Sequence, residues 1–416
     1  MINTPLYIAR KMGEEQHRGS RVVRTTSMIV MSSVALSISV IIIALSIVSG
    51  FRKEVRERAG GYAGQVIVSP FGTDYIDDLY PLSLELSWLD TIKECKNVSH
   101  LQHFAFRHGL IKTEEAIQGV VIKGVGKEFD PSFFNSCIVQ GRFPQWNDSI
   151  PSMELLISKR MSDALALKVL QKVNVYFIDN NSVRVRLFTV SGIFDAALEE
   201  FDKSLVIGDI RVVQQLNGWS PVQVGGIELF LHHPNQMERT ARKVREMAAR
   251  YGDENDTPIV VSTVKEIFPH LFDWLNLLDM NLLIVLLLMI AVAAVNMISG
   301  VLIMLFDKTS MIGLLKSLGM MDKDIRLTFI YRMGRLILWG MLIGNTVAVV
   351  LCLVQKKFTI ITLDQTNYAV SSVPINMDVW SICLMNVLSF VLILSIVYLA
   401  SMMVTRISPE RSLRIT

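Results

Sequence analysis

The chain has 416 residues, of which 51% are hydrophobic and 19% charged, and its net charge is +3 at neutral pH. These averages are close to those of a soluble protein, but residues 25–51, 280–306, 336–355 and 379–405 contain no Asp, Glu, Lys or Arg. Each segment is long enough to cross a bilayer as a helix, which takes about 20 residues. This pattern excludes an ordinary soluble enzyme, a disordered chain and an outer-membrane barrel, whose strands have about 10 residues of alternating polarity.

Residues 1–24 are predicted to form a cytoplasmic amphipathic N-terminus, followed by a first transmembrane helix at 25–51. The N-terminal segment has two acids against five cations, Arg10, Lys11, Arg18, Arg21 and Arg24, and basic flanks stay in the cytoplasm. The apolar run is about twice as long as that of a cleaved signal peptide, which has 7–15 residues. We therefore expect an uncleaved anchor.

Residues 52–275 are predicted to form a mixed α/β domain outside the cytoplasm. Strand-like runs occupy 65–68, 117–122, 173–178, 182–194, 204–207 and 227–231, and helical runs occupy 154–167, 209–216 and 235–250. Asn180 and Asn181 indicate a tight hairpin between two of the strands. Cys95 and Cys137 can form a disulfide in an oxidising compartment, but two free thiols are the favoured interpretation.

The C-terminal part is predicted to contain three further transmembrane helices, at 277–306, 330–355 and 379–405. They are joined by a cytoplasmic loop at 307–326 and a periplasmic loop at 356–378, and a cytoplasmic tail follows at 406–416. The loop and the tail are rich in cations (Lys308, Lys316, Lys323, Arg326, Arg406, Arg411 and Arg414), which places both termini in the cytoplasm. The cations at 52–58 contradict this orientation, but the long segment that follows them weakens their effect.

The sequence offers no catalytic residue and no metal site. The string nearest to a phosphate-binding loop, at 119–127, has Gly126 and Lys127 but no following Ser or Thr. The spacing of the histidines fits no standard metal site, and the low net charge argues against nucleic acid. The predicted spans also lack ionisable groups, apart from Asp279 at an edge, which argues against an ion-coupled transporter. We therefore expect a non-enzymatic chain whose energy comes from a partner.

Three groups of small or polar residues are candidates for contacts between helices. A stripe on the first span faces either a partner helix or a substrate path, or else it packs against the protein's own helices, and both interpretations stay open. The groups on the second and third spans are interpreted as packing sites within the chain. The stripe consists of Ser32, Ala35, Ser39, Ser46, Ser49 and Gly50, and the packing residues are Asn296, Gly300, Gly340, Gly344 and Ala348.

The cytoplasmic loop contains a short predicted helix with an apolar face. Apolar residues recur at helical spacing from Met311 to Leu318, and Gly319 is placed to end the helix. This face either lies on lipid or docks in a groove of a partner. The residues are Lys308, Met311, Ile312, Leu314, Leu315, Lys316, Leu318 and Gly319.

Five short segments, taken in order, resemble the FtsX-like permeases of ABC transporters, and most closely the lipoprotein-releasing group. They are 7–11 (YIARK), 44–51 (ALSIVSGF), 296–299 (NMIS), 312–319 (IGLLKSLG) and 406–414 (RISPERSLR). Two positions depart from the family pattern. Ser49 stands where asparagine is usual, and Met311 stands where an acid is common, which puts in doubt any polar contact of that acid with the ATPase.

The resemblance implies four transmembrane helices with a large periplasmic domain between the first two, in the bacterial inner membrane. It implies that this permease pairs with a second copy or a paralogous permease above an ABC ATPase dimer. The dimer contacts the helix at 308–319 and binds ATP and Mg, so no cofactor is expected in this chain. An acylated lipoprotein would be extracted from the membrane and passed to a periplasmic carrier. A mechanotransmitting permease for macrolide or peptide efflux and a cell-division-type signalling scaffold are the alternatives.

Overall fold

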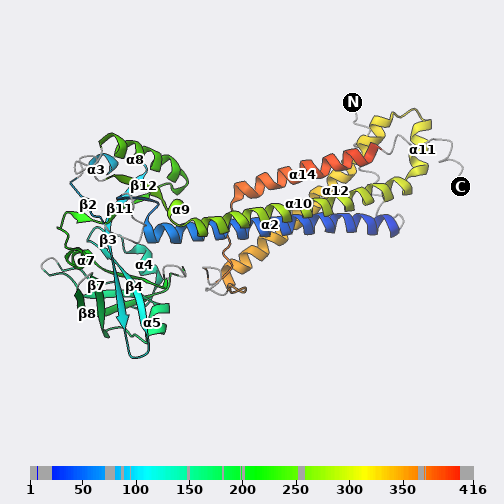
Figure 1. The fold of residues 1–416 in the computed structure, drawn as a ribbon. Coiled ribbons are helices and arrows are strands. Elements are labelled where there is room, and N and C mark those ends of the chain that lie inside the picture. Colours follow the sequence, from blue (N-terminus) through cyan, green and yellow to red (C-terminus); the bar gives the residue numbers. More distant parts are fainter. Residues whose placement is uncertain are drawn as a thin grey trace. The chain divides into compact units, whose positions relative to one another are not determined.

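The structure is a computed structural model, and it describes residues 7, 21–70, 80–85, 89–93, 95–147, 150–179, 182–196, 198, 202–251, 258–363, 370 and 372–402. The chain forms two compact units (Figure 1). One unit contains Met1–Lys53, Leu275–Thr362 and Ser372–Thr416, and the other contains Glu54–Trp274 and Leu363–Ser371. Residues 8–20 and 403–416 lie outside the described residues. They contain most of the segment 7–11 and all of the segment 406–414, two of the five segments that carry the family resemblance.

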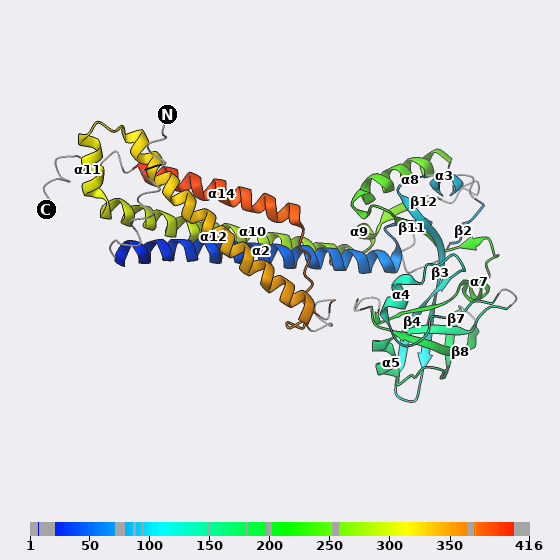
Figure 2. The same ribbon diagram turned by 180° about the vertical axis from the view of Figure 1, so that it is seen from behind.

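The first unit is helical, and the described residues include four helices long and apolar enough to cross a membrane. They are α2 (Arg21–Ala63), α10 (Pro269–Asp307), α12 (Asp322–Phe358) and α14 (Val379–Ser401). The short helix α11 (Thr309–Ser317) lies at the bend between α10 and α12 (Figure 2). Helices α2, α10 and α12 are all longer than the charge-free segments that predicted them, because helical structure continues through their charged flanks.

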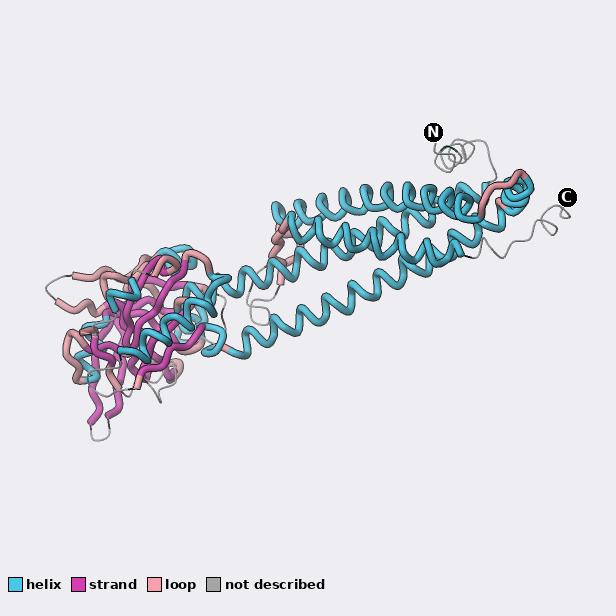
Figure 3. The backbone as a smooth tube through the Cα atoms, turned by 90° about the horizontal axis from the view of Figure 1, so that it is seen from above, coloured by secondary structure: helices cyan, strands magenta, loops and turns pink. Residues whose placement is uncertain are grey.

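The membrane helices, whose backbones are traced in Figure 3, pack through a shared apolar core. Val34 and Ile38 of α2 lie in it together with Met297 of α10, Ile337 of α12 and Ile393 of α14. Close contact is possible where α12 has glycines, since a side-chain carbon at Gly340 would lie 2.9 Å from a carbonyl oxygen of α2. Much of α10 and α14 remains exposed, as only 11% and 17% of their most apolar windows are buried. These faces are apolar and therefore suit lipid or another protein.

The second unit is a mixed α/β domain built on one ten-stranded sheet with the order β12-β1-β11-β3-β4-β9-β6-β8-β5, in which β7 pairs with β3 and β8. The pairs β4·β9 and β6·β8 are parallel and the others are antiparallel. The strands are β1 (Val66–Pro70), β3 (Val98–Lys112), β4 (Ile117–Val125), β5 (Ile138–Gly141), β6 (Glu154–Ser158), β7 (Lys172–Asp179), β8 (Ser182–Phe194), β9 (Leu205–Asp209), β11 (Gly226–Leu231) and β12 (Ile259–Thr263), with β2 (Leu82–Ser83) and β10 (Gln223–Val224) in a separate pair.

Short helices complete this domain. They are α3 (Leu89–Lys93), α4 (Ser132–Cys137), α5 (Lys159–Leu165), α7 (Ile210–Asn217), the 3-10 helix η2 (Pro234–Gln236), α8 (Met237–Tyr251) and α9 (Val264–Ile267). The fold class expected from the sequence, four apolar helices with a mixed α/β domain between the first two, is confirmed. Cys95 and Cys137 are both free thiols, and burial raises the pKa of Cys137.

The six predicted strands are all present, whereas the helix predicted at 154–167 is wrong in its first part. Glu154–Ser158 is strand β6, and only Lys159–Leu165 is helical. Strand β6 lies between β8 and β9 with both faces buried, so its apolar run lacks the alternation typical of a strand. The helices predicted at 209–216 and 235–250 are confirmed as α7 and α8. Strands β7 and β8 pair up to Asp179 and Ser182, as the predicted hairpin requires, and its two asparagines lie outside the described residues.

The α/β domain begins and ends at neighbouring strands. Strand β1 follows α2 after only two residues, β12 leads through α9 into α10, and Val66 of β1 lies opposite Thr263 of β12. Gln65 joins this edge, because its amide donates to Leu229 O at 2.9 Å and its carbonyl accepts from Val264 at 3.0 Å. Thr263 also forms a capping box with Glu266 at the start of α9. The two helices that connect to the domain therefore meet one antiparallel strand pair.

Candidate functional site

Helix α11 forms where the sequence predicts a short cytoplasmic helix. It covers Thr309–Ser317, and Gly319 follows in the left-handed region at φ +85°. The Leu318 amide donates to Leu314 O and the Met320 amide to Leu315 O, both at 3.0 Å, so the last carbonyls of the helix are satisfied. Glycine is favoured at Gly319 because a side chain makes this backbone conformation costly.

The apolar residues of α11 divide into a packed row and an exposed row. Ile312 is fully buried, and Leu315 and Met311 pack against the core of the membrane helices. Leu314 and Leu318 are 54% and 75% exposed. Together with Met321, which is 69% exposed, these two leucines form what we call the α11 surface. Its small apolar area, carried on a capped helix, has the form that an amphipathic helix presents to a groove of another protein.

Lysines flank the α11 surface. Lys316 forms a 2.9 Å ion pair with Asp322 at the start of α12, and this pair joins the end of α11 to the next helix. Lys308 precedes the helix and lies 3.4 Å from Asp307. Both lysines are thus held by acids of this chain, which leaves the exposed leucines as the distinctive feature of the surface.

The small-residue stripe of α2 packs largely within the protein. The hydroxyl of Ser39 donates to Gly344 O of α12 at 2.9 Å, and Ala35 lies against the same glycine. Ser49 donates to Asn376 O at 2.7 Å, and the backbone at Gly50 lies against Pro374. Of the remaining members, Ser46 is buried and its carbonyl accepts from the Asn376 amide, whereas Ser32 is exposed and donates to Ile29 O of its own helix.

The packing residues predicted on the other spans lie at helix contacts. Asn296 of α10 donates to the Ser33 hydroxyl of α2 at 2.5 Å, and Gly300 lies against Val30. Gly340, Gly344 and Ala348 of α12 are buried. The sequence interpretation missed one polar pair, in which Asn345 of α12 and Asn386 of α14 exchange two hydrogen bonds of 2.8 and 2.9 Å. An amide inside a charge-free span was the signal that could have found it.

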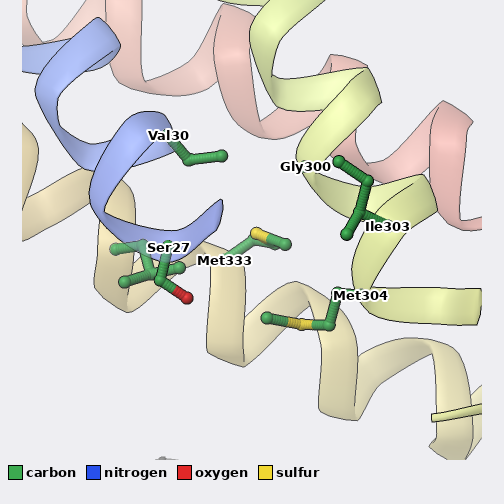
Figure 4. A pocket seen from close by; sticks show the side chains of 7 residues that line it. Ser27, Val30, Gly300, Ile303, Met304 and Met333 are labelled. Atoms are coloured by element: carbon green, nitrogen blue, oxygen red, sulfur yellow. The ribbon is translucent and has the colours of Figure 1, made fainter. Parts of the chain in front are cut away.

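A small pocket lies between α2, α10 and α12 (Figure 4). Its lining is almost entirely apolar and consists of Ser27, Val30, Gly300, Ile303, Met304, Met333 and Leu336. The buried hydroxyl of Ser27 has no hydrogen-bond partner among the described residues. Because this lining has a single polar group, it provides no basis for recognising a polar ligand.

The hairpin of β7 and β8 exposes apolar residues on the α/β domain. Val183, Val185 and Leu187 alternate along β8 and are 43–60% exposed, and Ile178 opposite Val183 is 63% exposed. We call these four residues the hairpin surface. Arg184 and Arg186, which alternate with them, are exposed as well. Exposed apolar groups gathered on one strand pair are characteristic of an interaction site, and sequence alternation could not reveal that both faces of β8 are exposed at this end.

One histidine of the domain, His103, lies next to a carboxylate. His103 Nε2 lies 2.9 Å from the Glu128 carboxylate. Burial acts to raise the pKa of Glu128, but the hydrogen bond and electrostatic attraction from His103, together with backbone hydrogen bonds, outweigh burial and lower that pKa overall. Among the described residues, no group of three or more His, Cys, Asp or Glu side chains is placed to hold a metal ion.

Comparison with known proteins places both units in families. The chain is 24% identical over 409 residues to the lipoprotein-releasing system transmembrane protein LolC of Xylella fastidiosa strain 9a5c, with 93% of each chain covered. It is 24% identical over 414 residues to the LolC protein of Neisseria meningitidis serogroup B, with 93% of this chain and 94% of that protein covered. Among solved structures, the periplasmic region of MacB from Actinobacillus actinomycetemcomitans matches with 12% identity and a TM-score of 0.34, over 50% of this chain and 92% of that one.

Two family models match consecutive parts of the chain. The MacB-like periplasmic core domain matches residues 27–273, more than half of the chain, and the FtsX-like permease C-terminal domain matches residues 283–409. The first match contains the α/β domain, and the second contains α11, α12 and α14. The chain therefore belongs to the family with a MacB-like periplasmic core domain and an FtsX-like permease domain, and it is a permease of an ABC transporter.

Proposed function

We propose that this permease extracts lipoproteins from the inner membrane and passes them to a periplasmic carrier, with ATP hydrolysis by a separate subunit. The observation that carries this proposal is the match to LolC proteins over 93% of both chains, through the membrane helices and the α/β domain alike. The order of elements in this chain also supports it, because the helical and α/β parts each match one of the two family models.

The chemistry of a lipoprotein suits this architecture. An acyl chain gains about 0.8 kcal/mol for each CH₂ group that it buries in the membrane. Extraction of several chains therefore requires an external source of energy and apolar protein surface, but no catalytic side chain. The exposed apolar faces of α10 and α14 offer such surface at membrane depth. We infer that the lipid anchor leaves the bilayer along apolar faces of this kind, in a pair formed with a second copy or a paralogous permease.

We infer that the ABC ATPase docks on the α11 surface. We also infer that ATP and Mg are bound by the ATPase and not by this chain. Leu314 and Leu318 are the exposed apolar residues of this helix. This arrangement requires α11 and both termini to lie in the cytoplasm, as the distribution of cations predicts. A carrier would bind on the periplasmic side, and the hairpin surface is our candidate for that contact because its four apolar residues are exposed.

Efflux of a macrolide or peptide is the second candidate function. It is favoured by the family model of residues 27–273, which is named after MacB. A lipoprotein-releasing permease and an efflux permease of this architecture differ in cargo, so they can be separated genetically. The signalling scaffold expected as a third possibility has no specific observation in its favour.

The proposed function is tested with the complex of this permease and its ATPase, purified without ATP. We expect an acylated protein to copurify and to be released to a soluble carrier when ATP and Mg are added, and mass spectrometry identifies it by its lipid-modified N-terminal peptide. The control is the same complex with an ATPase that cannot hydrolyse ATP. Depletion of the permease should trap outer-membrane lipoproteins in the inner membrane. Drug hypersensitivity with normal lipoprotein localisation would instead support efflux.

A further inference from the structure

A fully buried ion pair lies on one face of the sheet in the α/β domain. Lys123 of β4 and Glu228 of β11 approach to 2.5 Å, and both side chains are 0% exposed. Strand β3 separates them, and its Gln102, which lies directly opposite Glu228, donates to the second carboxylate oxygen at 2.7 Å. Taking two charges out of water is costly, and replacement of such a pair by apolar residues is often neutral or stabilising. Stability of the sheet alone is therefore a weak reason for the pair.

The pair has a further partner at the end of a membrane helix. Lys123 Nζ donates a 2.7 Å hydrogen bond to the carbonyl oxygen of Tyr62, in the last turn of α2. The last carbonyls of a helix have no donor within the helix and carry its negative dipole end. A buried ammonium group satisfies one of them with a charge-assisted bond. Burial lowers the pKa of Lys123, and Glu228 acts in the opposite direction.

Other contacts hold the same end of α2 against the domain. Val55, Ala59 and Ala63 are 0% exposed, so one side of the last turns is covered completely. The ring of Tyr62 lies 5.5 Å from that of Phe134 in α4, centre to centre. After Ala63 the chain turns at once into β1 through Gly64, whose φ is +69°. A side-chain carbon there would lie 3.1 Å from the Cβ of Glu228, so the turn and the ion pair lie in close contact.

We propose that Lys123 is a positioning residue for transport, which fixes the end of α2 to strands β4 and β11 so that movement of α2 reaches the sheet. Helix α2 is unbroken over 43 residues, and helices of this kind move as rigid elements in conformational changes. A helix end that frays or slides would absorb the movement. The inference rests on the proposed use of a partner's ATP hydrolysis, and it assigns the transmission to the bond between Lys123 and Tyr62 O, with the Glu228 oxygen as a second acceptor that an amide oxygen can replace.

A purely structural role makes a different prediction from an anchoring role. Glu228→Gln leaves the buried ammonium group without its counter-ion, which lowers stability, but it keeps an oxygen that accepts from Lys123, so the bond to Tyr62 O remains. Lys123→Met with Glu228→Met removes both charges, fills a similar volume and cannot bond to that carbonyl. If the pair only stabilises the domain, a variant should lose transport only to the extent that its melting temperature falls. If Lys123 is an anchor, a variant that keeps the bond to Tyr62 O should transport normally, and one that loses it should not.

The experiment measures lipoprotein released per ATP hydrolysed by the full complex, together with its melting temperature. We expect Glu228→Gln to release at close to the wild-type ratio. We expect the double Met variant to fall by about tenfold, with ATPase activity and folding retained. Lys112→Met, the same substitution at an exposed position of β3, is the matched control. The inference is overturned if the double Met variant releases normally, or if release falls in Glu228→Gln as far as in the double variant.

Hydrogen exchange of the intact complex provides a second measurement. In Lys123→Met, the amides of the last turn of α2 should exchange faster than in the wild type, while those of the central strands stay protected. Unchanged exchange in that turn would contradict the anchor even if the double variant failed to assemble. Absence of ATP-driven release by the wild-type complex would instead refute the proposed function, so the two failures are distinguishable.

Discussion

The hydroxyl of Ser39 in α2 donates a 2.9 Å hydrogen bond to the backbone carbonyl of Gly344 in α12. A side chain can reach the backbone of a neighbouring helix only where the two helices approach closely. The same hydroxyl also donates to Ala35 O at 2.7 Å within its own helix. The contact between α2 and α12 thus combines a small residue on each helix with a polar group shared between them.

Gly344→Ala is predicted to weaken this contact. The added carbon would lie 2.6 Å from the carbonyl oxygen of Ala35, a distance that forces the helices apart. Overpacking of this kind costs about 1–3 kcal/mol of unfolding free energy. Gly334→Ala on the same helix is the matched control, because its nearest neighbour would be 3.8 Å away. Thermal unfolding in detergent should separate the two, and equal melting temperatures would contradict the close contact.

The paired amides of Asn345 and Asn386 are predicted to show energetic coupling. Either Asn→Leu substitution alone leaves the other amide without its interhelical partner, so the double variant should lose less stability than the sum of the two. Double-mutant cycles between membrane helices give about 0.6 kcal/mol on average and about 1.7 kcal/mol at most. A cycle measured by unfolding in detergent checks the value. Strict additivity would show that the two bonds contribute nothing across α12 and α14.

Leu314→Glu is predicted to prevent docking of the ATPase while membrane insertion and thermal stability stay normal. The side chain is exposed, so a charge there interferes with an apolar contact to a partner but not with this chain's core. Copurification of the ATPase and ATP-driven release are the measurements. Ser317→Glu, an exposed polar position of the same helix, is the control. Normal release by Leu314→Glu would remove the α11 surface from the coupling mechanism.

The neighbouring substitution Leu315→Glu is a poorer test. Leu315 is half-buried and packs against the core of the membrane helices. A charge there is expected to disturb the packing of α11 itself, so that loss of release would have two explanations. Leu314→Glu is therefore the substitution that tests docking without disturbing the packing of α11.

The stability of the α/β domain is predicted to fall at acid pH partly through Glu154. Burial acts to raise the pKa of its carboxyl, but bonds from Arg142, at 2.9 and 2.5 Å, and from the Gln145 amide outweigh it and lower the pKa. The stabilisation is complete above the unfolded pKa of about 4.3 and is lost as pH falls through the lower folded value.

Glu154→Gln should accordingly reduce the dependence of melting temperature on pH below about pH 5. At neutral pH the variant should be less stable than the wild type, because the charge-assisted bonds from Arg142 are lost. Glu114→Gln, at an exposed position, is the control. Identical acid profiles for wild type and Glu154→Gln would contradict this assignment.

The sequence was sufficient for the large divisions of the fold because charge-free segments of membrane length have few alternative explanations. It was less informative within the α/β domain. Strand β3, which pairs with β11, β4 and β7, was missed because His100, Gln102, His103, Arg107 and His108 interrupt its apolar pattern. Several of these polar side chains have partners in the fold that no local pattern reveals, such as Glu128 for His103 and Glu228 for Gln102.

The candidate sites show the same limit. The spacing of apolar residues predicted helix α11 but not which edge of its wide apolar stripe is covered. Ile312 and Leu314 lie at opposite edges of that stripe, and only Ile312 is buried. Similarly, Lys123 and Glu228 are separated by 105 residues and each is unremarkable alone. Their pairing depends on the order of three strands, which the sequence does not specify locally.

The pairing of β1 with β12 has an evolutionary consequence. Val66 and Thr263 lie opposite each other, so the chain enters and leaves the domain at adjacent points. A short connection could join the flanking helices in place of the whole segment, because closing a short loop costs little entropy. The domain is in this sense an insertion between helices α2 and α10. The whole domain can therefore be exchanged in evolution while the flanking helices keep their sequence and packing.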